Sequence, residues 1–306
     1  MKMDSDFLYD VIIIGGSYAG LSAAMSLGRS LRRVLIIDSG EPCNRQTPHS
    51  HNFITQDGEI PAMISEKAKN QVLNYSTVTF RKDLAVQVEE SDHGFRIRTR
   101  EGKTYGGEKL ILATGIKDVM PRIKGFAECW GITVIHCPYC HGYEFRNLKT
   151  GILAKGEKAY HLTSLVHNLT KDVTILTNGE PELTSSQRSI LREQYISVMD
   201  QRVIEIEHKN GYLEKVIFED GSELKLDALY AAVEFEQHSL IPVQLGCELT
   251  DQGYIKIDAM QKTSVPGVLA CGDNSSPMRS IAAAVAAGNL AGAAVNKELS
   301  ESHFYR

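Results

Sequence analysis

Two cysteines separated by two residues carry the sharpest chemical signal in this sequence. Cys137 and Cys140 lie in the segment HCPYCHGYE, with His136 before them and His141 after them. Such a pair can be half of a zinc site, a structural bridge or a redox dithiol. A short loop lets the two sulfurs form a reducible bond, and neighbouring imidazoles can lower thiol pKa values. The pattern therefore favours a redox-active dithiol at Cys137 and Cys140.

Zinc binding is the weaker interpretation of the same pair. A structural zinc ion takes four protein ligands, and the chain holds no second C-x-x-C and no H-x-x-x-H. His136 and His141 adjoin the cysteines, which makes a tetrahedral arrangement hard to reach. No ligand set accompanies the nearby pair His49 and His51. We therefore expect no metal site.

A glycine-rich segment near the start of the chain predicts a dinucleotide site. GGSYAG, residues 15–20, follows the apolar run YDVIII and precedes a stretch of small residues with helical character. It fits the G-x-G-x-x-G frame, with serine in place of the second glycine. Asp38 ends the next apolar run, about 20 residues further on, where a carboxylate can bond the ribose hydroxyls. Because a helix N-terminus offers N–H groups to a pyrophosphate, the candidate residues are Gly15, Gly16, Ser17, Ala19, Gly20 and Asp38.

The elements that must hold these groups follow from apolar runs and turn residues. Residues 9–14 and 34–37 read as buried parallel strands on either side of a helix, which makes one βαβ unit. Alternation of apolar and basic residues over 95–99 predicts a half-exposed strand. Further strands are expected at 110–112, 151–154, 173–176, 203–207, 213–219, 229–233, 253–257 and 265–273. Helices are expected after Pro61, at 158–169 and at 281–295.

The bulk composition is that of a folded globular protein with a sizeable core. At about 150 residues per domain, a chain of 306 residues predicts two domains. The 33 basic and 38 acidic residues give a net charge of −5, without the basic stripe of a nucleic-acid-binding surface. Neither a signal peptide nor a membrane-spanning apolar run is visible, so we expect a cytoplasmic protein without a membrane partner. The four isolated cysteines are expected to be small buried or half-buried residues: Cys43, Cys129, Cys247 and Cys271.

The order of the motifs resembles that of the thioredoxin reductases. Residues 263–288, TSVPGVLACGDNSSPMRSIAAAVAAG, resemble the FAD-closing segment of flavoproteins with two dinucleotide-binding domains. Ala113-Thr114-Gly115 matches the ATG signature of that family, and the dithiol follows it at the distance found in the thioredoxin reductases. The resemblance implies an α/β fold with two Rossmann-like domains, the second inserted into the first. The FAD-binding domain would be 1–116 and 243–306, and 117–242 would be an inserted NAD(P)H-binding-like domain that carries the dithiol.

The resemblance also implies individual roles. FAD is the implied cofactor. Cys140 would face the flavin and Cys137 would exchange with a protein or small-molecule disulfide or dithiol. Asp273 would bond the ribityl chain, and the start of the next helix would face the isoalloxazine. The family residues carried over to the cofactor site are Ala113, Thr114, Gly115, Gly272, Asp273, Ser280, Ile281, Gln46 and Asn52. A homodimer is implied by resemblance alone.

One departure from the family concerns the residue after the second cysteine. The thioredoxin reductases have Asp-Gly there, with the aspartate as the acid–base group, whereas this chain has His141-Gly142. Histidine titrates near neutral pH and is a competent proton carrier. The sequence CxxCHG also resembles that of the dithiol oxidases of disulfide natural-product biosynthesis. His141 therefore joins Cys137 and Cys140 as a candidate catalytic residue.

A second departure concerns the nicotinamide nucleotide. The segment that should carry a second glycine motif reads AKGEKA, residues 154–159, and Thr177-Asn178-Gly179 stands where the family has an H-R-R stretch. A 2′-phosphate without a guanidinium loses charge-assisted hydrogen bonds, so NAD(P)H binding is doubtful. Three functions stay open: a nicotinamide-driven disulfide reductase, an NADPH-independent dithiol oxidase that uses oxygen, and a reductase with another donor such as ferredoxin.

Overall fold

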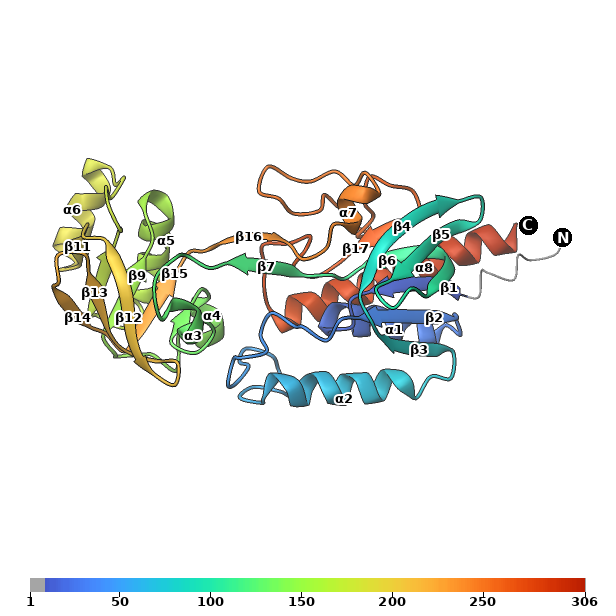
Figure 1. The fold of residues 1–306 in the computed structure, drawn as a ribbon, viewed down its shortest axis with the longest axis horizontal. Coiled ribbons are helices and arrows are strands. Elements are labelled where there is room, and N and C mark those ends of the chain that lie inside the picture. Colours follow the sequence, from blue (N-terminus) through green and yellow to red (C-terminus); the bar gives the residue numbers. More distant parts are fainter. Residues whose placement is uncertain (1–8, 306) are drawn as a thin grey trace. The chain divides into compact units, whose positions relative to one another are not determined.

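The computed structural model describes residues 9–305, and the chain divides into two compact units (Figure 1). Unit 1 contains the described residues up to 45 together with 62–117 and 235–305. Unit 2 contains residues 46–61 and 118–234. Both units are built on a parallel sheet with helices, which confirms the α/β class.

A mostly parallel sheet forms the centre of unit 1. Its order is β3 (Val78–Lys82), β2 (Val34–Asp38), β1 (Tyr9–Ile14), β6 (Thr104–Leu112), β5 (Gly94–Thr99) and β4 (Ala85–Ser91). The antiparallel strand β5 pairs with the first half of β6, and β17 (Val268–Ala270) pairs in parallel with its second half. A strand from the last part of the chain therefore completes a sheet that begins at residue 9. Buried aliphatic side chains of β1 and β2 supply much of its core.

Two long helices of unit 1 lie against each other. They are α1 (Tyr18–Arg29) and α8 (Ile281–Phe304). Small residues allow the close approach, since a Cβ at Gly292 would lie 2.6 Å from the carbonyl oxygen of Ala23. The remaining helices of the unit are α2 (Pro61–Leu73) and the short α7 (Ile241–Gln244).

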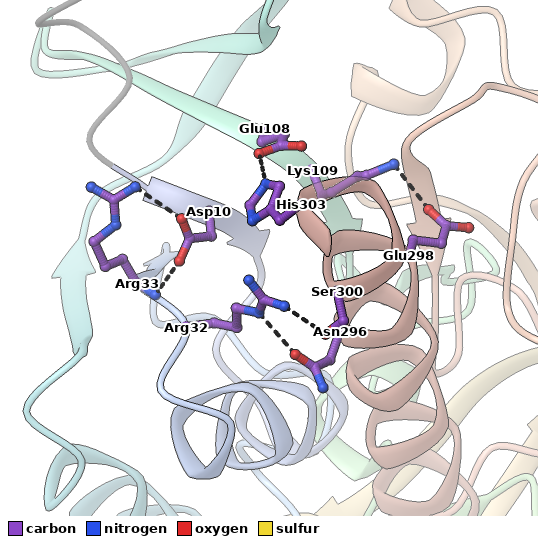
Figure 2. A network of polar contacts seen from close by, with 9 residues as sticks. All are labelled: Asp10, Arg32, Arg33, Glu108, Lys109, Asn296, Glu298, Ser300 and His303. Atoms are coloured by element: carbon purple, nitrogen blue, oxygen red, sulfur yellow. Dashed lines mark hydrogen bonds and ion pairs between the residues drawn. The ribbon is translucent and has the colours of Figure 1, made fainter. Parts of the chain in front are cut away.

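Polar contacts fasten the C-terminal half of α8 to the sheet and to the end of α1 (Figure 2). Glu298 accepts from Lys109 at 2.9 Å and lies 2.6 Å from the Nζ atom of Lys262. Arg32 donates to Asn296 and to Ser300, both at 2.8 Å. These contacts explain why the helix runs to Phe304 and not only to residue 295 as the alanine-rich pattern predicts.

Unit 2 contains two sheets. A parallel sheet has the order β11 (Ser197–Met199), β10 (Val173–Leu176), β9 (Thr150–Leu153), β15 (Ala228–Ala231) and β8 (Val134–Ile135). An antiparallel sheet follows the order β12 (Val203–Lys209), β13 (Tyr212–Phe218) and β14 (Glu223–Lys225). The helices are α3 (Phe126–Cys129), α4 (Pro138–His141), α5 (Gly156–Val166) and α6 (Ser185–Glu193).

Two of the four points at which the chain passes between the units lie at short strands that pair with each other. These are β7 (Ile116–Val119) and β16 (Glu234–Gln237). Lys117 of the first donates to Glu236 of the second at 2.8 Å. The crossings at 117/118 and 234/235 therefore lie in one two-stranded ribbon.

Two expectations from the sequence were wrong. Residues 253–257 form no strand, because Gly253 adopts φ +88° in a turn closed by Thr250, and only an isolated bridge from Ile255 to Leu249 follows. Cys43 is exposed, whereas Cys129, Cys247 and Cys271 are buried as expected. Among residues 9–305, no helix is long and apolar enough to span a membrane.

Candidate active site

The first glycine motif forms the turn between β1 and α1. Gly15 adopts φ +104°, and a side chain there would collide with the carbonyl oxygen of Ala113. Gly20 packs directly against Gly15, because a Cβ atom added at position 20 would collide with the carbonyl oxygen of Gly15. Ser17 is the N-cap residue of α1, its side chain forms no capping hydrogen bond, and the first turn holds no acidic residue. The positive end of α1 therefore meets no carboxylate of its own first turn, as a pyrophosphate site requires.

Asp38 lies at the end of β2, beside this turn. Its Oδ1 atom accepts from the backbone N–H of Gly16 at 2.8 Å, and Oδ2 accepts from Gly40 at 3.0 Å. These bonds fix the carboxylate at the carboxyl edge of the parallel strands, where such sheets bind nucleotides. The structure thus brings Asp38 together with the glycine turn, as the sequence predicted.

The crossover segment and the C-terminal segment also reach this edge. Ala113 donates to Ile14 of β1 at 2.8 Å, and Gly272, with φ +89°, comes so near α1 that its Cβ would lie 3.0 Å from that of Ala19. Asp273 lies 3.8 Å from the Nε atom of Arg279. Ser280 caps α8 by accepting from Ala283 at 3.1 Å, which places Ile281 as the first helical residue, and Gly115 follows Thr114 with φ +65°.

Asn274 is a residue of this edge that the sequence did not single out. It is fully buried, and its Nδ2 atom donates to Leu112 at 2.9 Å and to Thr114 at 3.2 Å. It therefore ties the segment after β17 to the segment after β6. Its position directly after Gly272-Asp273 was the sequence feature that could have identified Asn274 as a residue of this edge.

Gln46 and Asn52 lie in unit 2 and not with the glycine turn. Gln46 donates to the carbonyl oxygens of Ala127, at 3.2 Å, and Trp130. Asn52 has φ +60° and its backbone N–H donates to Asp57 at 2.8 Å. Residues 46–61 are therefore a loop anchored on the segment that precedes the dithiol, and we call them the 46–61 loop.

Cys137 and Cys140 form a disulfide, with their Cα atoms 5.3 Å apart. The four-residue helix α4 produces this geometry because Cys137 is its N-cap and Pro138 its first residue, where a missing N–H costs nothing. The backbone N–H of Cys140 donates to the sulfur of Cys137 at 3.1 Å. Both cysteines are half-buried, and Tyr139 between them is exposed. An outside thiol can therefore approach this disulfide more easily than it could a fully buried one.

His141 is the last residue of α4 and follows Cys140 directly. Burial, followed by the positive charge of protonated His51, lowers the pKa of His141 to about 4. The imidazole is therefore neutral at pH 7, and a neutral imidazole can accept a proton from a thiol.

His51 of the 46–61 loop lies between two carboxylates. Its Nε2 atom is 3.6 Å from Glu144, and its Nδ1 atom is 3.7 Å from Asp57. Glu144 follows the dithiol helix by one turn, so His51 is near the redox segment in space although far from it in sequence. The sequence showed the His49–His51 pair but nothing that linked it to His141.

His136, directly before Cys137, stacks on Trp130 with ring centroids 5.7 Å apart and an interplanar angle of 26°. Trp130 also stacks on Phe126, and its Nε1 atom donates to Asp118 at 3.1 Å. Trp130 is therefore a packing residue that orients the start of the dithiol segment. Burial raises the pKa values of Cys129 to about 11 and of Cys271 to about 12, which makes these thiols poor nucleophiles at neutral pH.

The start of α5 in unit 2 differs from the start of α1 in unit 1. The N–H of Gly156, its first residue, donates to the carbonyl oxygen of Pro181 at 3.0 Å. Glu157 lies in the first turn, and the Glu182 carboxylate is 3.8 Å from Lys155 at the N-cap. Pro181 and Leu183 are buried on either side of exposed Glu182, so this cover is anchored by apolar packing.

Comparison with known proteins places this geometry in context. The family model described as pyridine nucleotide-disulphide oxidoreductase matches residues 9–288. A thioredoxin reductase of Aspergillus oryzae named aclD is 35% identical over 95% of this chain and 96% of its own. The crystal structure of a putative thioredoxin reductase from Bacillus anthracis has a TM-score of 0.91 and 31% identity, covering 96% and 99% of the two chains. That of an oxidoreductase from Agrobacterium tumefaciens has a TM-score of 0.88 and 36% identity, covering 95% and 98%.

Proposed function

The chain belongs to the pyridine nucleotide-disulphide oxidoreductase family, and from this we propose that it is an FAD-dependent thiol–disulfide oxidoreductase of the thioredoxin-reductase type. The observation that carries the proposal is the Cys137–Cys140 disulfide in α4, followed directly by a neutral imidazole at His141. Relatives along nearly the whole chain carry the name thioredoxin reductase, which supports the same chemistry.

We propose that unit 1 holds the FAD. The family uses a flavin, and the residues at the carboxyl edge of the sheet fit one: an α1 N-terminus without an acidic first turn, a close glycine turn and a carboxylate at Asp38. Gly272 and Asp273 would complete the site from the C-terminal segment, and the split domain would comprise 1–116 and 243–306. Bound FAD supplies the two-electron chemistry that returns the cysteine pair to its other redox state.

The exchange itself needs only this chain's sulfurs and a proton carrier. The Cys137 thiolate attacks a substrate disulfide, whose S–S bond breaks and releases one substrate thiolate. The Cys140 thiolate then attacks the mixed disulfide at Cys137, which forms the Cys137–Cys140 bond and releases the second substrate thiolate. The two protons lost by the cysteines end on the two substrate thiols, and we propose that His141 carries them.

Two features of unit 2 support the proposal that it binds no nicotinamide dinucleotide. The N-terminus of α5 already binds the Pro181 carbonyl, and a pyrophosphate there would meet Glu157 and Glu182. At the end of β10, Asn178 accepts from the backbone of Val203 at 2.8 Å, and no guanidinium stands at that position. We propose that 117–242 is a nucleotide-free domain that carries the dithiol. The covered N-terminus of α5 favours a second candidate function, in which a small dithiol is oxidised and oxygen or another carrier accepts the electrons.

An anaerobic titration of the purified flavoprotein distinguishes the two directions. NADPH, NADH and dithiothreitol are added in separate experiments while the visible flavin band is followed. We expect bleaching by dithiothreitol and none by either nucleotide. Rapid bleaching by NADPH or NADH would show that the protein is a nicotinamide-driven reductase. It would contradict the proposal that 117–242 binds no nucleotide. A protein that binds no FAD would contradict the proposed function as a whole.

The proposal also covers the oligomeric state of the protein and its location in the cell. The resemblance to thioredoxin reductases supports a homodimer, which sedimentation equilibrium would test. A cytoplasmic location is the matching proposal, and cell fractionation would test it.

A further inference from the structure

Two tyrosines beside the dithiol expose their rings to solvent. Tyr139, between the two cysteines, is 68% exposed, and Tyr143 is 67% exposed. Gly142, which follows α4, keeps a right-handed helical backbone, so the helical spacing continues to Tyr143. With about 100° of turn per residue, the two tyrosine side chains leave the helix axis only about 40° apart. Both rings therefore lie on the same side of the dithiol helix.

That side is the open flank of the disulfide. On the same helical spacing, Cys140 lies about 100° from Tyr139 in one direction and about 100° from His141 in the other. His141 is partly buried, whereas Tyr139 is exposed. In a mixed disulfide the substrate sulfur lies about 2 Å from the cysteine sulfur, so the group that carries it must lie against residues beside the cysteines. The tyrosines are on the flank where there is room for that group.

Contacts in the next turn hold Tyr143 in place. The guanidinium carbon of Arg146 lies 4.0 Å from the centre of the Tyr143 ring, and its Nη1 atom donates to the Tyr143 carbonyl oxygen at 2.7 Å. Gly142 has no room for a side chain, because an added Cβ would collide with the carbonyl oxygen of Pro138 and with Leu169. The ring is therefore held before a ligand arrives, which lowers the entropy cost of binding.

Arg146 also brings an unpaired positive charge to this surface. It is exposed, and within the described part of the chain its guanidinium forms no ion pair and donates only to Tyr143. Since a guanidinium has five N–H donors in a planar fork, it can bind a carboxylate through two parallel hydrogen bonds. A carboxylate on the substrate would complement this charge.

The size of the surface suits a small molecule. An aromatic side chain buries about 150–250 Å², so the two rings offer about 300–500 Å² together. A specific protein interface buries about 800 Å² of each partner. Most of the exposed residues that follow Tyr139 are polar, namely Glu144, Arg146, Asn147 and Lys149.

We propose that Tyr139, Tyr143 and Arg146 determine substrate specificity, and that the substrate is a small disulfide or dithiol with a flat apolar ring and a carboxylate beside its sulfur. The inference rests on the proposed dithiol chemistry. The tyrosine rings pack against the substrate ring, and Arg146 binds the carboxylate. The Cys137 thiolate breaks the substrate S–S bond and releases one thiolate, and the Cys140 thiolate releases the second as the Cys137–Cys140 bond forms. The two cysteine protons end on the two released thiols.

Four disulfide probes separate the ring from the carboxylate. Dithiobis(nitrobenzoate) has both, dithiodipyridine has only the ring, dithiodipropionate has only the carboxylate, and hydroxyethyl disulfide has neither. The FAD-loaded Cys43→Ser enzyme, which lacks the exposed thiol, is the parent protein. It is reduced with dithiothreitol, freed of it anaerobically and mixed with each probe. Acid quenching, maleimide labelling and mass spectrometry then count the remaining Cys137 and Cys140 thiols. Each variant's rate is divided by the parent's rate with the same probe, so that differences between the leaving thiols cancel.

We expect Tyr139→Ala to slow the two ring-bearing probes about fivefold relative to the other two. Tyr139→Phe keeps the ring and should retain most of the parent rate with those probes. Arg146→Gln should slow the two carboxylate probes about threefold relative to the neutral ones. Tyr195→Ala is the matched control, because it removes a tyrosine of unit 2 that is 93% exposed and lies outside the dithiol segment. It should leave all four rates unchanged.

A Tyr139→Ala protein that slows all four probes equally, or none of them, would overturn the proposal. So would an Arg146→Gln protein that treats carboxylate and neutral probes alike. If Cys137 and Cys140 of the parent react with none of the four disulfides, the proposed dithiol chemistry itself is contradicted. The two failures are therefore distinguishable.

Discussion

Gly288 of α8 lies directly on the backbone of Ala19 of α1, so closely that a Cβ at position 288 would collide with the Ala19 carbonyl oxygen. The contact joins the first and last long helices of unit 1 beside the glycine turn. Ala19 therefore belongs both to the contact between the two helices and to the glycine motif of the proposed cofactor site.

Gly288→Ala tests this contact. Alanine is the better helix former by up to about 1 kcal/mol, so an uncrowded site would gain stability. Here we expect a loss of about 1–3 kcal/mol, because the helices must move apart. Urea unfolding measures the change in the free energy of unfolding. Ala286→Ser, at an exposed position of the same helix, is the control, and a stabilised Gly288→Ala protein would contradict the packing argument.

Gly15→Ala tests the glycine turn. We expect the purified variant to lose bound FAD, because the new methyl group collides with Ala113 at the edge of the sheet. Gly102→Ala is the matched control, since Gly102 also has a positive φ but has no atom within 4 Å of its Cβ position. Both variants carry the backbone penalty of about 1–2 kcal/mol, so the difference in flavin content reports the collision alone.

Cys140→Ser tests the dithiol. We expect the flavin content to be unchanged and electron transfer between flavin and thiols to stop, as measured by anaerobic bleaching with dithiothreitol. Cys43→Ser, which removes an exposed cysteine outside the disulfide, should behave as wild type. Normal turnover by Cys140→Ser would rule out the mechanism.

The pKa of His141 predicts a pH dependence of stability. It falls from 6.5 in the unfolded chain to about 4 in the folded protein, so the unfolded state binds more protons between these values. The contribution of neutral His141 to the free energy of unfolding is therefore full above pH 6.5. As the pH falls toward 4, it decreases by on the order of 3 kcal/mol. His141→Gln should therefore lose less stability than wild type between pH 7 and pH 4 in denaturant titrations. His161→Gln, on the exposed side of α5, should follow the wild-type curve.

Glu298 predicts a second acid-sensitive contact. Burial raises the pKa of this carboxyl, but hydrogen bonds from Lys262 and Lys109 outweigh burial and leave it lowered. Its stabilising effect is therefore present above the normal carboxyl pKa and is lost as the pH falls through the lowered value. Glu298→Gln should cost about 1 kcal/mol at pH 7 in urea unfolding. Glu301→Gln, whose exposed pair with Lys297 spans 3.8 Å, should cost little, and equal losses would contradict the network.

Local patterns predicted the fold well where each element carries its own signal. The apolar runs before Gly15 and before Asp38 are short, β-branched and bounded by turns, and they form β1 and β2. The strand expected at 253–257 did not form because Gly253 takes a left-handed conformation in a turn, which leaves only an isolated bridge from Ile255 to Leu249. The ribbon of β7 and β16 was missed since its two strands lie more than a hundred residues apart and read as polar linkers.

The candidate site was predictable only as far as its motifs extend along the chain. Cys137, Cys140 and the glycine turn lie in continuous segments whose spacing carries the chemistry. His51 and Glu144 come from separate segments, and nothing in either one signals the other. The covering of α5 by Pro181 likewise depends on how a loop folds back, which the composition of AKGEKA does not reveal.

The placement of β17 and α8 after all of unit 2 in the sequence has a consequence for biosynthesis. β6 cannot acquire its β17 partner, and α1 cannot acquire α8, until residues 268–304 have left the ribosome. Residues 118–234 are complete long before that point. Unit 2 can therefore fold while α1 of unit 1 still exposes the apolar surface that α8 will cover. This reverses the usual order, in which the amino-terminal part of a nascent protein folds first.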